Sequence, residues 1–270
     1  MQLRDLSIKM QRISHILISH LHGDHFYGLI GLLSTYALLG RTKELMIIGP
    51  KELEPWILNT LKVSSSYLTY PLLFSPTPEN ENAVIWENDW LSIHSIPLKH
   101  RVQCNGFLFQ EKSHERKLIK WMVKEFKIGI EESIALKKNQ VIKRASGEIL
   151  DPNDVCEPII QPRSYFFCTD TLPLTFDYTA LQNIDLLYHE STFLEEHTQR
   201  AKATFHSTAK QAAQVALNLR AKALILGHFS ARYPHIEDFV LEAKSIFPCT
   251  TLAEEGKTWS IPLRFGKESV

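Results

Sequence analysis

Four potential metal ligands lie within six residues, directly after an apolar stretch of the chain. They are His20, His22, Asp24 and His25, and the apolar stretch covers residues 13–19. Its alternation of apolar and polar residues predicts a buried or half-buried strand. Imidazole and carboxylate ligands together suit zinc or a similar first-row metal better than calcium or magnesium. A histidine-rich polar surface loop is the plain alternative, but such crowded side chains would repel one another on protonation unless a cation collected them. The cluster therefore predicts a metal site at the end of a strand.

The segment that follows the cluster reads as a helix. Gly23 is expected to let the backbone turn sharply enough for the four side chains to converge. Residues 26–39 are mostly apolar and contain no proline, which predicts a buried helix that ends at Gly40.

The composition indicates a globular protein with a sizeable core. The chain has 270 residues, of which 44% are hydrophobic, enough for one large domain or two small ones. Lys plus Arg equals Asp plus Glu at 30 each, so any basic surface for nucleic acid must be local. Four widely spaced cysteines without a Cys-x-x-Cys pair indicate a reducing compartment rather than a disulfide framework. No apolar run reaches the length of a membrane span and no leader pattern is present, so a soluble cytoplasmic protein is expected.

Extended and helical segments alternate along the rest of the chain. Strands are predicted over residues 45–48, 67–74, 83–86, 90–96, 106–109, 164–168, 184–188, 223–226 and near 258–261, and helices over 51–61, 207–219 and 236–246. Ser207 or Thr208 can cap the alanine-rich helix. This alternation favours an α/β sandwich with helices on the outside.

Residues 111–160 differ in character from their surroundings. Between residues 111 and 144, ten Lys and Arg residues stand against five Glu residues, with apolar side chains between the charges. An ordinary solvated helical face is one reading of this pattern. An insertion that holds a phosphate backbone is the other.

Three further potential ligands share one placement. His100, Asp170 and His228 each follow the end of a predicted strand, where α/β folds collect their active sites. Taken singly, each has a plain alternative, namely a surface histidine, a helix cap and a turn residue.

The opening cluster also carries a family resemblance. The spacing His-x-His-x-Asp-His after a strand resembles the signature of the metallo-β-lactamase fold, and the run from His20 to Thr35 resembles ribonuclease Z, the family that trims tRNA 3′ ends. The resemblance implies an αββα sandwich over residues 1–270, with an inserted basic arm at about 111–160 that grips tRNA. The Gly-Pro-rich turn common in bacterial arms is not evident here. Family members carry strands before the metal loop, so the chain is expected to be truncated at its N-terminus.

Residue by residue, the resemblance implies two Zn2+ ions per chain, with Mn2+ or Mg2+ as possible substitutes. His20, His22 and His100 would bind the first ion, Asp24, His25 and His228 the second, and Asp170 would bridge both. The shared order of these residues argues against unrelated surface positions. The ions are implied to activate a water and to neutralise charge on a scissile phosphate. Asp24 is implied as the proton acceptor.

A second pair of motifs resembles the same family. His189-Glu190-Ser191-Thr192 resembles its His-Glu-Ala-Thr motif, and Phe205-His206-Ser207-Thr208 resembles its His-Ser-Thr motif. Glu190 is expected to orient His206, or to hold it protonated for donation to the leaving group. A buried structural pair is the alternative. Arg232, within a Ser-x-Arg-Tyr match, is a candidate for binding phosphate.

These features together predict a zinc-dependent endoribonuclease that removes the 3′ trailer from precursor tRNA and leaves a 3′ hydroxyl. The resemblance further implies a homodimer without a membrane partner. Another dinuclear hydrolase of the same fold, acting on a small phosphodiester or ester, is one alternative. An inactive, truncated RNA-binding homologue is the other.

Overall fold

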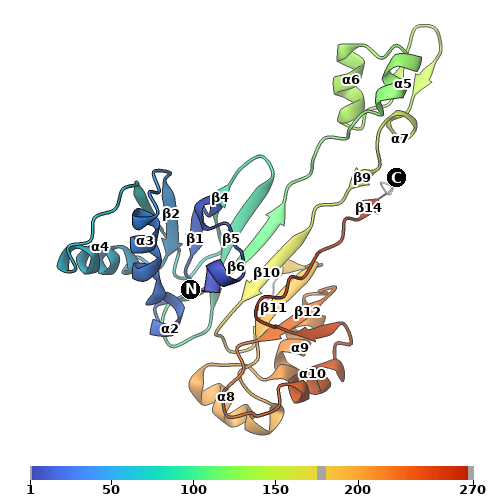
Figure 1. The fold of residues 1–270 in the computed structure, drawn as a ribbon. Coiled ribbons are helices and arrows are strands. Elements are labelled where there is room, and N and C mark those ends of the chain that lie inside the picture. Colours follow the sequence, from blue (N-terminus) through green and yellow to red (C-terminus); the bar gives the residue numbers. More distant parts are fainter. Residues whose placement is uncertain (1, 175–180, 267–270) are drawn as a thin grey trace. The chain divides into compact units, whose positions relative to one another are not determined.

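The computed structural model describes residues 2–174 and 181–266, and the chain forms two compact units. The sandwich unit comprises residues 1–87, 92–109 and 164–259, and the arm unit comprises residues 88–91, 110–163 and 260–270. Figure 1 labels most of their helices and strands. The prediction of one domain with an inserted arm at about 111–160 stays a prediction.

The first sheet of the sandwich unit has three parallel strands. β1 (His15–Leu17) pairs with β2 (Leu45–Gly49), which pairs with β3 (Leu72–Pro76). Parallel neighbours need a crossover connection, and helices α3 (Gly28–Leu38) and α4 (Leu53–Val63) lie in the two connections. Their apolar faces form one core with the sheet, in which Leu33, Tyr36 and Ile57 are fully buried.

The second sheet has seven strands in the order β13-β12-β11-β10-β6-β5-β4. Their bounds are β4 (Ala83–Glu87), β5 (Leu91–Leu98), β6 (Cys104–Glu111), β10 (Ser164–Cys168), β11 (Leu186–Glu190), β12 (Leu224–Gly227) and β13 (Thr250–Leu252). Strands β10 to β13 are parallel to one another, so their carboxyl ends meet at one edge.

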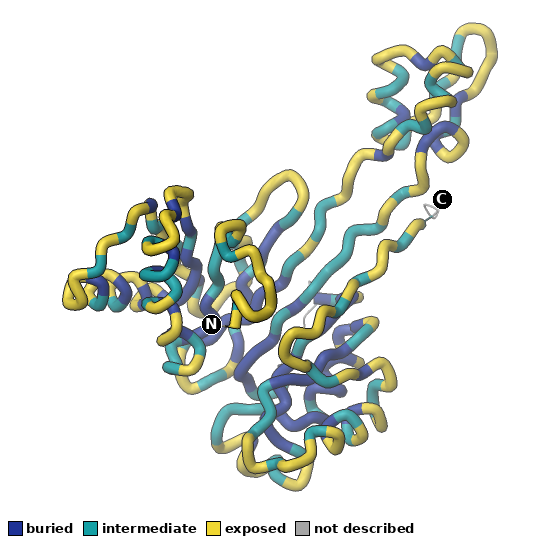
Figure 2. The backbone as a smooth tube through the Cα atoms, in the orientation of Figure 1, coloured by how far each residue is buried: buried dark blue, intermediate teal, exposed yellow. Residues whose placement is uncertain are grey.

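Helices α9 (Ala209–Asn218) and α10 (Glu237–Lys244) pack with the core of this second sheet. Buried alanines of α9 let it approach the strands closely, and the Thr208 side chain caps it by accepting from the Gln211 backbone N–H. Figure 2 shows the burial of β11 and β12 along the tube. Helices α1 (Gln2–Asp5) and α8 (Thr198–Thr204) also belong to this unit. The predicted α/β sandwich is confirmed.

Most predicted elements are present, but four predictions are wrong in part. The predicted helix at 26–39 is divided at Tyr27 between α2 (Gly23–Phe26) and α3, although it does end before Gly40. The strand predicted at 67–74 begins only at Leu72. No strand forms at 258–261, whose residues have no regular secondary structure, and β14 (Phe265–Gly266) follows instead. Strand β11 continues through residues 189 and 190, which were expected to follow it.

The role expected of Gly23 is also wrong. Gly23 is not among the residues with a positive φ, so no left-handed turn occurs there. A Cβ atom at this position would lie 2.2 Å from Cε2 of Tyr27. Glycine at position 23, the first residue of α2, therefore leaves room for the ring of Tyr27, which follows the last residue of that helix.

The arm unit has a small core of its own. It contains α5 (Lys120–Glu125), α6 (Ile130–Lys137), the hairpin of β7 (Ile142–Lys143) and β8 (Ile149–Leu150), α7 (Pro152–Val155), and β9 (Ile159–Ile160) paired with β14. Leu136, Leu150 and Val155 are buried together in it. The buried Arg116 guanidinium donates to the side chains of Asn139 and Asn153.

Among the described residues, no helix is both long and apolar enough to cross a membrane.

We expect Leu136→Ala to destabilise the arm unit by about 2–4 kcal/mol, because the side chain is fully buried and its removal leaves a cavity. Amide hydrogen exchange should accelerate in α5 and α6. Ile134→Ala on the same helix is the control, since Ile134 is half exposed. Unchanged exchange in the Leu136 variant would contradict the assignment of this core.

Candidate metal centre and its hydrogen-bond network

The potential ligands converge from five places in the sandwich unit. His20 and His22 lie in the loop after β1, and Asp24 and His25 lie on α2. His100, Asp170 and His228 follow the ends of β5, β10 and β12. His20, His22, His100, Asp170 and His228 follow strands as expected, whereas Asp24 and His25, which were expected in the loop, lie on helix α2.

One group of ligand atoms comes from His20, His22, His100 and Asp170, and these atoms lie within 4.8 Å of one another. Nδ1 of His22 is 3.2 Å from Nε2 of His20 and 3.2 Å from Nε2 of His100. Oδ2 of Asp170 lies 3.7 Å from the His20 nitrogen and 3.8 Å from the His100 nitrogen. Three imidazole nitrogens and a carboxylate oxygen thus face a common centre.

A second group comes from Asp24, His25 and His228. Nε2 of His25 lies 3.6 Å from Oδ2 of Asp24 and 3.7 Å from Oδ2 of Asp170. Nε2 of His228 lies 3.3 Å from Oδ1 of Asp170. The two oxygens of Asp170 therefore contact members of both groups. His206 forms an additional group with Asp170 and His228, which the sequence did not suggest.

The electrostatics of these histidines fit a bound cation. Burial, followed by repulsion from His25, lowers the pKa of His20 to about 3 despite the attraction of Asp170. Burial also lowers the pKa of His25 and of His100. These imidazoles are therefore neutral at pH 7 and keep a lone pair each, the state that binds a metal. The nitrogen and oxygen donors match the preferences of zinc and similar first-row metals.

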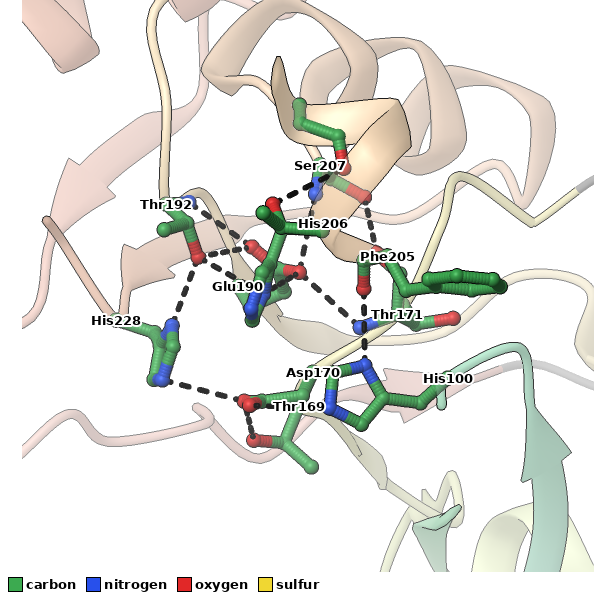
Figure 3. Close-up of polar contacts among 12 residues, drawn as sticks. His100, Thr169, Asp170, Thr171, Glu190, Thr192, Phe205, His206, Ser207 and His228 are labelled. Atoms are coloured by element: carbon green, nitrogen blue, oxygen red, sulfur yellow. Dashed lines mark hydrogen bonds and ion pairs between the residues drawn. The ribbon is translucent and has the colours of Figure 1, made fainter. Parts of the chain in front are cut away.

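Glu190 lies fully buried beside this centre, and its carboxylate accepts from five donor atoms (Figure 3). Oε1 accepts from the backbone N–H groups of Thr171 and Ser207, at 3.1 and 3.0 Å, and from Nδ1 of His206, at 2.9 Å. Oε2 accepts from the backbone N–H and the hydroxyl of Thr192, at 2.9 and 2.8 Å. Hydrogen bonds from three separate segments of the chain thus satisfy this fully buried carboxylate.

His206 differs electrostatically from His20, His25 and His100. Burial alone would lower its pKa, but the hydrogen bond and the charge of Glu190 outweigh burial and raise the pKa. The sequence placed Glu190 and His206 together, and the structure brings them into direct contact at 2.9 Å.

Two residues of the site have left-handed backbones although neither is glycine. Phe205 has a φ of 61° and His228 has a φ of 60°. The carbonyl of Phe205 accepts from Nδ1 of His100 at 3.0 Å, which leaves Nε2 of His100 facing the ligand group. Such backbones gather at functional sites, where surrounding contacts hold them in place. No sequence signal pointed to Phe205.

Two arginines lie near the centre. Nε of Arg232 donates to the Ser230 hydroxyl at 2.9 Å, and its guanidinium lies 5.0 Å from the centroid of the Phe193 ring. Arg101, which no sequence motif indicated, donates to the carbonyl of Ala203 and contributes a positive charge that opposes protonation of His206. In the sequence, the position of Arg101 directly after His100 could have indicated that it lies near the site.

Comparison with known proteins identifies the family. The chain is 40% identical over 260 residues to the ribonuclease Z of Parabacteroides distasonis, covering 96% of this chain and 86% of that protein. It is 43% identical over 248 residues to the ribonuclease Z of Cytophaga hutchinsonii, covering 91% and 79%. The chain belongs to the ribonuclease Z family. No family model matches it.

Solved structures agree with membership of the ribonuclease Z family. The short form of human tRNase Z is 25% identical, with a TM-score of 0.63 over 96% of this chain and 83% of that one. The metallo-β-lactamase fold protein YhfI of Bacillus subtilis, 16% identical, has a TM-score of 0.59 over 93% of this chain and 79% of that one, and shows the fold alone. The metallo-β-lactamase fold predicted from the opening motif is therefore confirmed.

Protonation should destabilise the metal-free chain. Because the pKa of His20 is about 3 in the fold and 6.5 ordinarily, the unfolded chain binds more protons between these values. Stability should therefore fall as the pH drops below about 6.5, by about 1–2 kcal/mol for this group between pH 7 and pH 5. Urea unfolding of the chelator-treated chain at pH 7 and at pH 5 measures this loss of stability. The His20→Asn variant should lose less stability over this pH range than the parent. A variant of the exposed His114 should lose as much as the parent. Equal losses in the two variants would contradict the assignment of this pH dependence to His20.

Proposed function

We propose that this chain is a metal-dependent endoribonuclease that removes the 3′ trailer from precursor tRNA. The reaction hydrolyses one phosphodiester bond, leaving a 3′ hydroxyl on the tRNA and a 5′ phosphate on the trailer. The observation that carries the proposal is the pairing of two metal-ligand groups with a protonatable histidine, His206, in a member of the ribonuclease Z family.

The ligand groups fit two zinc ions that share one carboxylate, with Mn2+ or Mg2+ as substitutes. His20, His22 and His100 would hold one ion, Asp24, His25 and His228 would hold the other, and Asp170 would contact both. When bound, such ions supply an activated water and offset the negative charge that develops on the phosphate. Asp170 lies close to histidines of both groups, which supports its role as the shared carboxylate.

His206 is suited to donate the proton that the leaving O3′ requires. Glu190 occupies its Nδ1, so Nε2 is the nitrogen left to carry a proton to substrate. The side chain is 15% exposed and lies 5.2 Å, between ring centroids, from His100. It is thus close to the ligand groups and still reachable. Asp24, whose side chain is 73% exposed, has an oxygen available to accept a proton from the attacking water.

Cationic side chains supply the remaining contacts with RNA. Arg232 and Arg101, near the metal groups, are placed to bind phosphates that flank the cleaved bond. In the arm unit, Arg144 is paired with Glu132 and Glu148, and Arg163 is paired with Glu111. Among the described residues of the unit, the exposed lysines are Lys117, Lys120, Lys124, Lys127, Lys138 and Lys143. These lysines support the tRNA-gripping role of the arm. A homodimer, suggested by the family resemblance, is part of the proposal and is tested by sedimentation.

The deciding experiment is incubation of the zinc-loaded chain with labelled precursor tRNA that carries a 3′ trailer, followed by mapping of the product ends. The expected products are tRNA with a 3′ hydroxyl and a trailer with a 5′ phosphate. Hydrolysis of a small chromogenic phosphodiester without any cleavage of precursor tRNA would overturn the substrate assignment and favour a small-molecule hydrolase.

Removal of the proposed proton donor should slow the chemical step. His206→Asn is expected to lower kcat for precursor tRNA by about 100- to 10,000-fold, because proton donation by a positioned side chain contributes that much. Zinc content, measured by elemental analysis, should stay unchanged. His114→Asn is the matched control at an exposed histidine of the arm unit. Loss of zinc from the His206 variant would instead make His206 a metal ligand.

The arm lysines should govern affinity rather than chemistry. Replacing Lys120, Lys124 and Lys127 by Ala should flatten the dependence of tRNA binding on salt, by roughly 0.7–0.9 in log K against log salt for each phosphate that is no longer neutralised. Hydrolysis of a small phosphodiester should be unaffected. The matched control replaces three exposed lysines of the sandwich unit, Lys9, Lys43 and Lys62. An equal salt slope in the two triple variants would contradict the role of the arm.

A further inference from the structure

The hydroxyl of Thr192 joins two parts of the site that otherwise have separate tasks (Figure 3). Its oxygen lies 2.8 Å from Oε2 of Glu190 and 2.8 Å from Nδ1 of His228. It also lies 3.1 Å from Nδ1 of His206. Thr192 itself is buried, with 8% of its surface exposed. One hydroxyl thus connects the buried carboxylate to a proposed metal ligand.

The direction of these hydrogen bonds follows from counting protons. An ionised carboxylate only accepts, and Glu190 already accepts from three backbone N–H groups and from His206. The single proton of the Thr192 hydroxyl therefore points to Glu190. Towards His228 the hydroxyl oxygen has only lone pairs to offer, so Nδ1 of His228 must carry the proton.

The consequence lies at the opposite nitrogen of the same ring. When Nδ1 of His228 is protonated, Nε2 keeps its lone pair, and Nε2 faces Asp170 at 3.3 Å within the ligand groups. A ring with the proton on Nε2 would present N–H to the metal and could not bind it. The neighbouring His206 is compatible with this arrangement, because its Nδ1–H donates to Glu190 at the shorter distance of 2.9 Å.

His100 offers a comparison within the same site. Its Nδ1 donates to the backbone carbonyl of Phe205, which can only accept, so the tautomer of His100 is set by the main chain. His228 has a hydroxyl in that place, which can either donate or accept. Only the bond from Thr192 to Glu190 makes this hydroxyl an acceptor towards the histidine.

We propose that Thr192 is a positioning residue that fixes the Nδ1-protonated tautomer of His228, and that Glu190 sets this tautomer through it. The single negative charge of Glu190 then acts on two residues, directly on the proton donor His206 and through Thr192 on the metal ligand His228. This role rests on the metal centre of the proposed function, and it is independent of which RNA is cleaved. Partners of this kind change metal affinity by about 10- to 100-fold when they are removed.

The test compares three variants of the full-length, zinc-loaded chain. Thr192→Val keeps the shape of the side chain but removes the hydroxyl, and Thr192→Ser keeps the hydroxyl. Thr250→Val removes the hydroxyl of another buried threonine, which bonds to the Phe247 carbonyl away from the ligand groups. Zinc affinity is measured by competition with a chromogenic chelator.

We expect Thr192→Val to weaken one of two zinc sites by about 10- to 100-fold, with a much smaller effect on the other. Thr192→Ser should stay within about threefold of the parent, and Thr250→Val should bind zinc as the parent does. Equal affinity of the Thr192→Val variant and the parent at both sites would overturn the proposal.

A second measurement needs no variant that removes the hydroxyl. Nitrogen-15 NMR of the unaltered zinc-loaded chain, with His228 assigned by its loss in His228→Gln, should show a proton on Nδ1 of His228. A proton on Nε2, or a metal bound at Nδ1, would overturn the proposal even if Thr192→Val failed to fold. Zinc binding with this tautomer but without cleavage of precursor tRNA would overturn the proposed substrate alone.

Discussion

The site depends first on one buried negative charge. Glu190 is the last residue of strand β11 and has no exposed surface, and a lone carboxylate in such a place would be strongly unfavourable. Backbone N–H groups at residues 171, 192 and 207 converge on it, so three connections of the sandwich unit are held at fixed distances from one another. Each of those connections contains a residue with a proposed role in the site. The hydrogen bonds that make this burial tolerable are therefore the same ones that define the geometry of the centre.

The histidines around Asp170 have the opposite character. They are crowded with nitrogen facing nitrogen at 3.2 Å, which is favourable only while the rings are neutral or share a cation. Burial lowers the pKa of His20, His25 and His100, and so keeps these three rings neutral at pH 7. His206 is the exception, because Glu190 stabilises its charged form. The fold thus places neutral imidazoles and a protonatable one next to each other by giving only one of them a buried carboxylate partner.

Local patterns in the sequence predicted much of this arrangement, and its failures have physical causes. Residues 164–168 form the strand that their apolar run predicted, and Asp170 follows it as expected because carboxyl ends of parallel strands share an edge. The strand predicted at 258–261 is absent, since alternation cannot reveal whether a partner strand is available. The inclusion of Glu190 in β11 was missed, because it depends on pairing with Gly227 of β12, a distant residue that local alternation does not reveal. Nor does the residue type of Phe205 suggest a positive φ.

The left-handed backbone of Phe205 links the position of His100 to the position of His206. Its carbonyl holds the ring of His100, and the next residue along the chain is His206, which reaches Glu190. A shift of this short segment would therefore move the acceptor of His100 and the ring of His206 together. A substitution at the end of α8 that displaces Phe205 should change the positions of both histidines at once, although neither of them has been replaced.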